Sequence, residues 1–118
     1  MHEVFHPLPP NNVKLLPSPF LHRYNLNRRY VLDLRNDNLL QNYYMEAGLW
    51  GPRHRAGLDG CHGGWEIPTC QLRGHFLGHW LSAVARLYAA TGDAEAKAKG
   101  DAVVAELARC QEENGGEW

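Results

Sequence analysis

The polar side chains of this sequence that could do chemistry form a row at helical spacing. Within residues 70–91 they recur every three or four positions, which places them along one side of a helix. Histidine, glutamine and serine make directional hydrogen bonds without a permanent charge, so the row is typical of a polar pocket lining. Its members are Gln71, His75, His79, Ser82 and Arg86.

A tryptophan beside a carboxylate precedes this row and follows two glycines. An indole can stack on the apolar face of a sugar ring, whose hydroxyls need hydrogen-bond donors and acceptors. We therefore predict a sugar-binding site that contains Trp65, Glu66, His75 and His79. The structural alternative stays open at this point: Trp65 would pack the loop onto the core, and Glu66 would be a favourable charge at a helix N-terminus.

A metal site is a competing interpretation of the same segment. His75 and His79 have the i, i+4 spacing that can hold one ion, and Cys61 or Cys70 could add a thiolate. However, the first histidine is not followed by the glutamate of the zincin motif. The two cysteines are also too far apart for a zinc knuckle.

The row needs a helix to position it, and the strongest helical pattern covers residues 70–91 and ends at Gly92. Asp93 can cap a further helix that runs to about residue 114, so the two helices are expected to form a hairpin. The apolar stripe of this further helix is predicted to consist of Ala96, Val103, Leu107 and Cys110. Gly74 and Gly78 would lie inside the first of these helices, where glycine is costly, which predicts a close approach by another group.

The remaining elements are weaker. Five of the seven prolines fall before residue 20, which favours an extended arm. The predicted elements are an arm over residues 1–17, a helix over 19–34 capped by Ser18 and ending near 36–38, a short helix over 39–47 that stops at Gly48, and a glycine-rich loop over 48–68. Residues Phe20, Tyr24, Val31 and Leu34 would form the apolar face of the first helix.

Composition limits the classes of function. The chain has 118 residues, with 12 Lys+Arg against 13 Asp+Glu, and this near-neutral balance argues against a nucleic-acid partner. The sequence shows neither a membrane-spanning segment nor a signal peptide, so we expect a cytoplasmic protein without a membrane partner. An odd number of cysteines, 3, favours free thiols.

Several segments resemble a known family. Residues 64–83, with the run Arg73-Gly-His-Phe-Leu-Gly-His-Trp-Leu-Ser82, are similar to the amino-terminal part of the β-L-arabinofuranosidase-like proteins of glycoside hydrolase family 127. Residues 13–20, 42–48, 88–93 and 110–115 resemble the same family. The resemblance implies an all-α fold in which helical hairpins form part of an α/α toroid, and an enzyme that removes terminal β-L-arabinofuranosyl residues with retention of configuration.

The resemblance also implies where the chemistry is located. Family members use a zinc-bound cysteine as nucleophile and a glutamate as acid/base, and zinc is held by a glutamate and cysteines that lie beyond the region similar to this chain. No catalytic or zinc-binding role is therefore transferred to Cys61, Cys70, Cys110 or Glu66. What is transferred is one wall of the sugar pocket, which predicts an amino-terminal fragment that binds no zinc and is inactive alone. The alternative is a small helical binding or scaffold module without catalytic activity.

Overall fold

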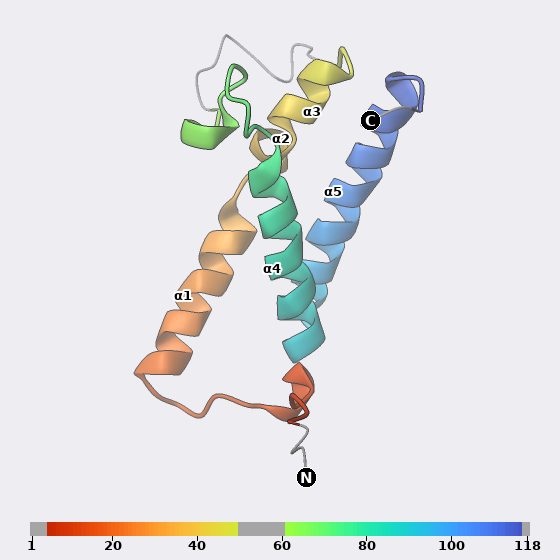
Figure 1. Cartoon of the computed structure of the whole chain (residues 1–118). Helices are drawn as coiled ribbons and strands as arrows, with labels where there is room; N and C mark the ends of the chain where they lie inside the picture. Colours follow the sequence, from red (N-terminus) through yellow and green to blue (C-terminus); the bar gives the residue numbers. More distant parts are fainter. Residues whose placement is uncertain (1–4, 50–60, 117–118) are drawn as a thin grey trace.

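The computed structural model describes residues 5–49 and 61–116, and within these two ranges it contains helices and turns but no strand. The predicted all-α class is thus confirmed for the described part of the chain. None of the helices there combines the length and the apolarity needed to cross a membrane. The elements in chain order are η1 (Pro10–Asn12), α1 (Pro19–Asp33), α2 (Asn36–Leu39), α3 (Gln41–Glu46), η3 (Gly64–Glu66), α4 (His75–Thr91) and α5 (Ala94–Glu113) (Figure 1).

The predicted hairpin is formed by α4 and α5, which lie side by side in Figure 1. Gly92 ends α4 with a φ of +69°, a left-handed conformation that glycine adopts without strain. Asp93 caps α5, because its Oδ1 accepts hydrogen bonds from the amides of Glu95 at 3.1 Å and Ala96 at 3.2 Å. Both signals were readable in the sequence.

Helix α1 begins as expected, with the Ser18 hydroxyl accepting from the Leu21 amide at 3.3 Å. Its apolar face is only partly as predicted, because Val31 is buried whereas Phe20 is 76% exposed. Figure 1 shows the reason: α1 lies close to α4 at the end near α2 and far from it at the start of α1. Only the last turns of α1 therefore contribute to the core.

The predictions for residues 36–47 were wrong in detail. Asn36 begins α2 instead of ending the preceding helix. The helix predicted over 39–47 is present as α3 but starts only at Gln41, because the chain breaks at Leu40 between α2 and α3. At this break both Leu39 and Leu40 are almost fully buried, at 1% and 0% exposure. The predicted stop is confirmed, since Gly48 has a φ of +67°.

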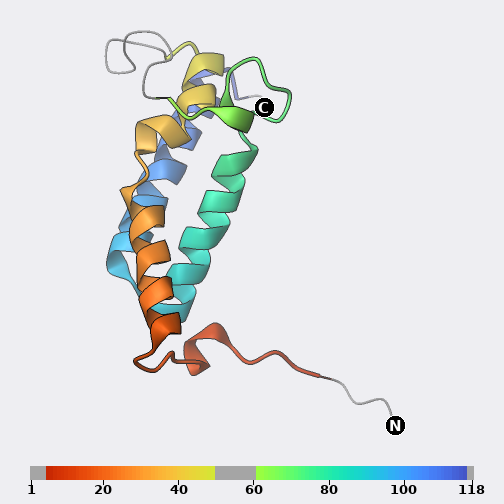
Figure 2. The same ribbon diagram turned by 90° about the vertical axis from the view of Figure 1, so that its left-hand side faces the viewer.

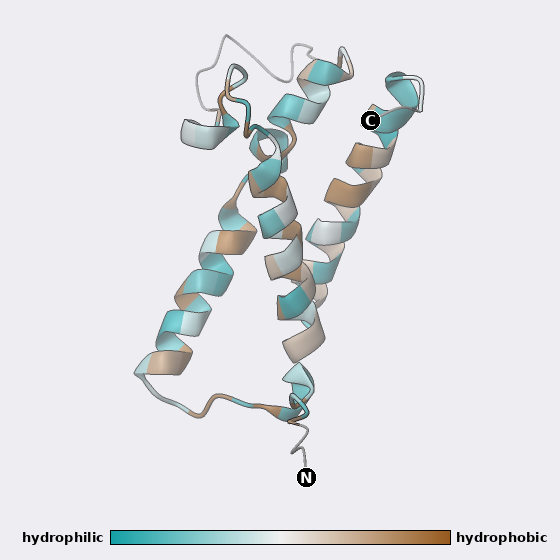
Figure 3. Cartoon of the chain, in the orientation of Figure 1, coloured by the Kyte–Doolittle hydropathy of each residue, from teal (hydrophilic) through white to brown (hydrophobic). Residues whose placement is uncertain are grey.

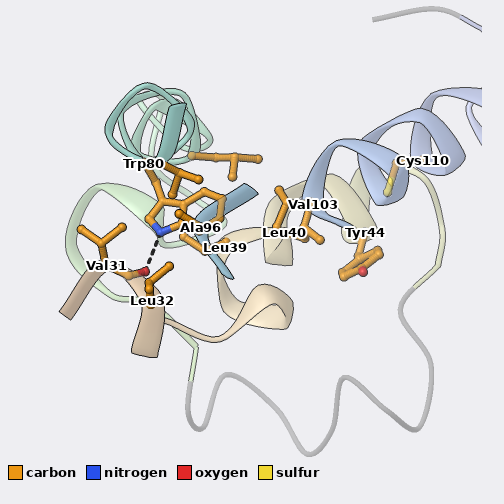
Figure 4. Close-up of a cluster of buried hydrophobic side chains, with 11 residues drawn as sticks. Val31, Leu32, Leu39, Leu40, Tyr44, Trp80, Ala96, Val103 and Cys110 are labelled. Carbon is orange, nitrogen blue, oxygen red and sulfur yellow. Dashed lines mark hydrogen bonds between the residues drawn. The ribbon is translucent and has the colours of Figure 1, made fainter. Parts of the chain in front are cut away.

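The core lies where α1, α2, α3, α4 and α5 meet (Figure 4). Trp80 of α4 is 3% exposed, and its indole N–H donates a 2.9 Å hydrogen bond to the carbonyl of Val31. The predicted stripe on α5 is confirmed by Ala96, Val103 and Cys110, each 0% exposed. The buried apolar residues are Val31, Leu32, Leu39, Leu40, Tyr44, Leu77, Trp80, Val84, Ala96, Val103 and Cys110.

The proline-rich segment before α1 is exposed throughout residues 5–17. Its middle part lies at the C-terminal end of α4, and the residues before it extend away from the helices (Figure 2). A single 3₁₀ turn, η1, interrupts it, with Pro10 at a first position where its missing N–H costs nothing. Hydrophobic residues alternate with hydrophilic ones along this segment and α1 (Figure 3). Many of the hydrophobic residues face solvent, such as Leu16, which is 75% exposed.

Candidate functional site

The helix that carries the histidines starts later than predicted. It begins at His75 instead of Cys70, because Gly74 has a φ of +89° and therefore cannot be part of a right-handed helix. Gln71 consequently lies in the turns before α4. The rest of the predicted row, His75, His79, Ser82 and Arg86, is exposed along one side of α4.

The two glycines that were expected to mark a close approach differ from each other. A side chain at Gly74 would meet the Tyr43 hydroxyl at 3.2 Å, and that hydroxyl donates to the Gly74 carbonyl at 3.1 Å. At Gly78, within α4, nothing lies within 4 Å of the place a Cβ would occupy. The prediction is therefore correct for Gly74 and wrong for Gly78.

This difference predicts opposite effects of the same substitution. Gly74→Ala should lower the free energy of unfolding by about 1–3 kcal/mol, because alanine is strained at positive φ and must displace the Tyr43 ring. Gly78→Ala should raise it by roughly 0.5–1 kcal/mol, because alanine is the better helix former and has open space there. Urea denaturation of the two variants checks this, and equal signs would contradict it.

Glu66 is the centre of a buried polar cluster at the start of α4. Its side chain is only 4% exposed, and both carboxylate oxygens accept hydrogen bonds. They accept from the Gly74 amide at 3.1 and 3.2 Å, from the Phe76 amide at 3.1 Å, and from the Asn42 side chain at 3.1 Å. Because Gly74 at the N-cap has no side chain, Glu66 satisfies the free amides of α4 from a distant position in the chain.

Two buried amide side chains of α3 hold the backbone on either side of Trp65. The Gln41 side chain accepts from the His62 amide at 2.7 Å, and it donates to the carbonyls of His62 at 3.0 Å and Glu66 at 2.7 Å. The Asn42 side chain also donates to the Glu66 carbonyl, at 3.0 Å. Residues 62–66 are therefore fixed on α3 by side-chain hydrogen bonds.

The predicted site residues lie at this end of α4 but differ in exposure. Glu66 bonds the amides on both sides of His75, so these two residues are neighbours in space. Trp65 is 63% exposed although its loop is held on both sides. His75 is exposed with its Nδ1 2.9 Å from the Leu72 carbonyl, and His79 is exposed one turn further along α4.

Burial controls the ionisation of the groups beside Glu66. The pKa of His62 is lowered by burial, and the Glu66 carboxylate opposes this shift without cancelling it. The pKa of Tyr43 is raised, first by burial and then by the charge of Glu66. The His62 ring also meets Phe76 edge to face, with centroids 5.7 Å apart. Burial therefore favours the neutral forms of the His62 imidazole and the Tyr43 phenol.

Gln41, Asn42 and His62 were not among the predicted site residues. The available signal was that residues 42–48 resemble the same family as the segment around Trp65 (residues 62–66, the tryptophan loop). Nothing in the spacing shows that these two segments meet, because the contact between Asn42 and Glu66 spans 24 residues.

A cavity of about 1060 Å³ lies at the opposite end of α4. It is bordered by the arm, by the first turns of α1 and by residues 87–93, and none of the predicted site residues lines it. Arg28 on its wall is engaged by Asp93 and Glu95, at 2.5 and 2.8 Å. The predicted sugar site and this cavity are therefore separate features.

The three cysteines of the described residues are free thiols in different surroundings. Cys110 is fully buried in the core, and burial raises the pKa of its thiol. The Cys70 sulfur accepts from the Leu72 amide at 3.4 Å. Within residues 5–49 and 61–116, no three His, Cys, Asp or Glu side chains gather as a metal site would need.

Comparison with protein families gives one match. A family described as "Beta-L-arabinofuranosidase, GH127 catalytic domain" matches residues 12–116, which includes α1, the tryptophan loop, α4 and α5. The match confirms the resemblance found in the sequence. Neither the comparison with curated proteins nor the comparison with solved structures yields a match.

Proposed function

Because the chain belongs to the family of β-L-arabinofuranosidase catalytic domains of glycoside hydrolase family 127, we propose that it forms one wall of the sugar pocket of a glycosidase. The substrate class is a glycoside with a terminal β-L-arabinofuranosyl or similar residue. The family match over residues 12–116 is the observation that carries this proposal.

Within the wall, the exposed side chains have the role of contacting sugar. The Trp65 indole is available for stacking, and the Nε2 atoms of His75 and His79 are available as hydrogen-bond partners of hydroxyls. Glu66 was also predicted to contact the sugar. Its four hydrogen bonds within the protein favour a positioning role, in which it sets the orientation of Trp65 relative to His75.

The remaining parts of the enzyme are proposed to lie outside these 118 residues. They would supply the catalytic residues, the zinc ligands and the other helical hairpins of an α/α toroid. The exposed apolar residues of α1 and α5, such as Phe20, Tyr30 and Val104, agree with such a partly assembled helical layer. Cys110 supports the same division, since it is fully buried in the core and burial raises the pKa of its thiol.

The test is hydrolysis of p-nitrophenyl β-L-arabinofuranoside by the complete gene product. Trp65→Ala should raise KM about tenfold, the value of one aromatic stacking contact of roughly 1.4 kcal/mol. Replacing His75 and His79 together by alanine should lower kcat/KM by about 10²-fold, the value of two lost hydrogen bonds. Glu112→Ala, on the exposed side of α5, is the matched control and should change neither constant.

Two results would contradict the proposal. One is an active protein whose KM is unchanged by Trp65→Ala and by the histidine variant. The other is a combination of two findings: the 118 residues alone unfold cooperatively, and the complete gene product shows no glycosidase activity. This combination would favour the non-catalytic module.

A further inference from the structure

We propose that Gln41 is a positioning residue whose side chain holds Trp65 in its sugar-contacting place, a role that rests on the proposed function. The Gln41 side chain is 2% exposed and forms three hydrogen bonds, all to the backbone of the tryptophan loop. It is bound to both the N–H and the C=O of His62, as a neighbouring strand would be.

The hydrogen bonds of Gln41 lie on both sides of Trp65. His62 is three residues before the tryptophan and Glu66 is the next residue, so the short turn η3 between them has little freedom to move. Gly63 and Gly64, at the start of this turn, have no side chains that could pack on a neighbour, and their carbonyls are held only by hydrogen bonds from the amides of Glu66 and Ile67 within the same turn. Without the Gln41 contacts, this glycine pair would let the indole sample many orientations.

An exposed indole held in this way is suited to binding. A side chain that is already ordered loses less conformational entropy when a ligand stacks on it, and the ligand therefore binds more tightly. Trp65 is 63% exposed, so packing of the indole against the protein contributes little to holding it in place. The buried amide of Gln41 supplies the order that the indole itself does not obtain from the core.

The variants are Gln41→Leu, which removes all three hydrogen bonds, and Gln41→Glu, which keeps the acceptor for the His62 amide but turns a carboxylate toward two carbonyls. In the complete gene product, each should raise KM for the arabinofuranoside about fivefold to tenfold and change kcat less than twofold. Val103→Ala, on the core-facing side of α5, is the control for lost stability and should leave KM unchanged.

A double-mutant cycle separates positioning from general destabilisation. If Gln41 acts through Trp65, Gln41→Leu should raise KM no further in a Trp65→Ala background. Time-resolved fluorescence anisotropy should also show faster local motion of Trp65 in Gln41→Leu, with the Trp65 signal obtained as the difference between each protein and the same protein carrying Trp65→Phe.

The outcomes distinguish this inference from the proposed function. Faster Trp65 motion together with a normal KM for Trp65→Ala would support the role of Gln41 and overturn the sugar contact. Unchanged anisotropy in both Gln41 variants would overturn the role of Gln41. A KM effect of Gln41→Leu that persists in the Trp65→Ala background would overturn it as well.

Discussion

Replacing Glu66 by alanine is expected to lower the free energy of unfolding by about 3–5 kcal/mol, because it removes several buried hydrogen bonds to a carboxylate at once. The Gly74 and Phe76 amides at the start of α4 and the Asn42 side chain would all lose their partner. The alanine leaves no group that can replace the carboxylate in a space closed to solvent. Chemical denaturation measures the loss, and hydrogen exchange at the Gly74 and Phe76 amides locates it.

Two further variants define what the carboxylate contributes. Glu66→Gln keeps the shape of the side chain and one acceptor oxygen. It should lower the free energy of unfolding by about 1.5–2.5 kcal/mol, roughly half the effect of Glu66→Ala. Glu112→Gln removes a carboxylate from an exposed position of α5 and should change stability by less than about 0.5 kcal/mol. The interpretation would be wrong if Glu66→Ala cost no more than the Glu112 variant, or if the two amides kept their protection from exchange.

The elements that were predicted well are those whose determinants lie close together in the sequence. Ser18, Gly92 and Asp93 each bond an amide or a carbonyl within four residues. The start of α1, the end of α4 and the start of α5 could therefore be predicted directly from the sequence. The stripe of α5 was also readable, since one regular helix carries the whole apolar pattern.

The elements that were predicted poorly depend on contacts between distant residues. The helical pattern continues smoothly through Cys70, and only the positive φ of Gly74 beside Tyr43 shows that α4 starts later. Similarly, Phe20 has the right spacing for a core residue, but it lies at the start of α1, where this helix is far from α4. Periodicity identifies a face of a helix but does not show how far a neighbouring helix covers it.

The candidate site shows the same limit. Sequence reasoning left open whether Glu66 binds a ligand or stabilises a helix N-terminus, because the two cases place the same residue in the same loop. The structure shows four hydrogen bonds that use both of its oxygens within the protein. Gln41 could not be found at all from spacing, because its partners are 21 and 25 residues away.

Replacing Trp80 by alanine is expected to cost about 3–5 kcal/mol, because it opens a large cavity among α1, α4 and α5. The indole has a second role that its size does not reveal. Val31 lies in the last turn of α1, where carbonyls lack a partner within the helix, and the Trp80 N–H supplies one at 2.9 Å. Trp80→Phe keeps most of the volume and removes this donor, and should cost about 1–3 kcal/mol.

Tyr88→Ala is the matched control for Trp80, since it removes an aromatic side chain from the same helix at a position that is 41% exposed, and it should cost less than about 1 kcal/mol. Urea denaturation of the three variants gives the order Trp80→Ala, Trp80→Phe, Tyr88→Ala. If Trp80→Phe matched the tyrosine variant, the hydrogen bond to Val31 would contribute nothing measurable.

The large effects expected at Trp80 and Glu66 have a common structural reason. Trp80 joins the end of α1 to α4, and Glu66 joins the tryptophan loop to the start of α4. Each connection supplies a helix terminus with a partner from a distant part of the chain, so both substitutions should loosen the packing around α4.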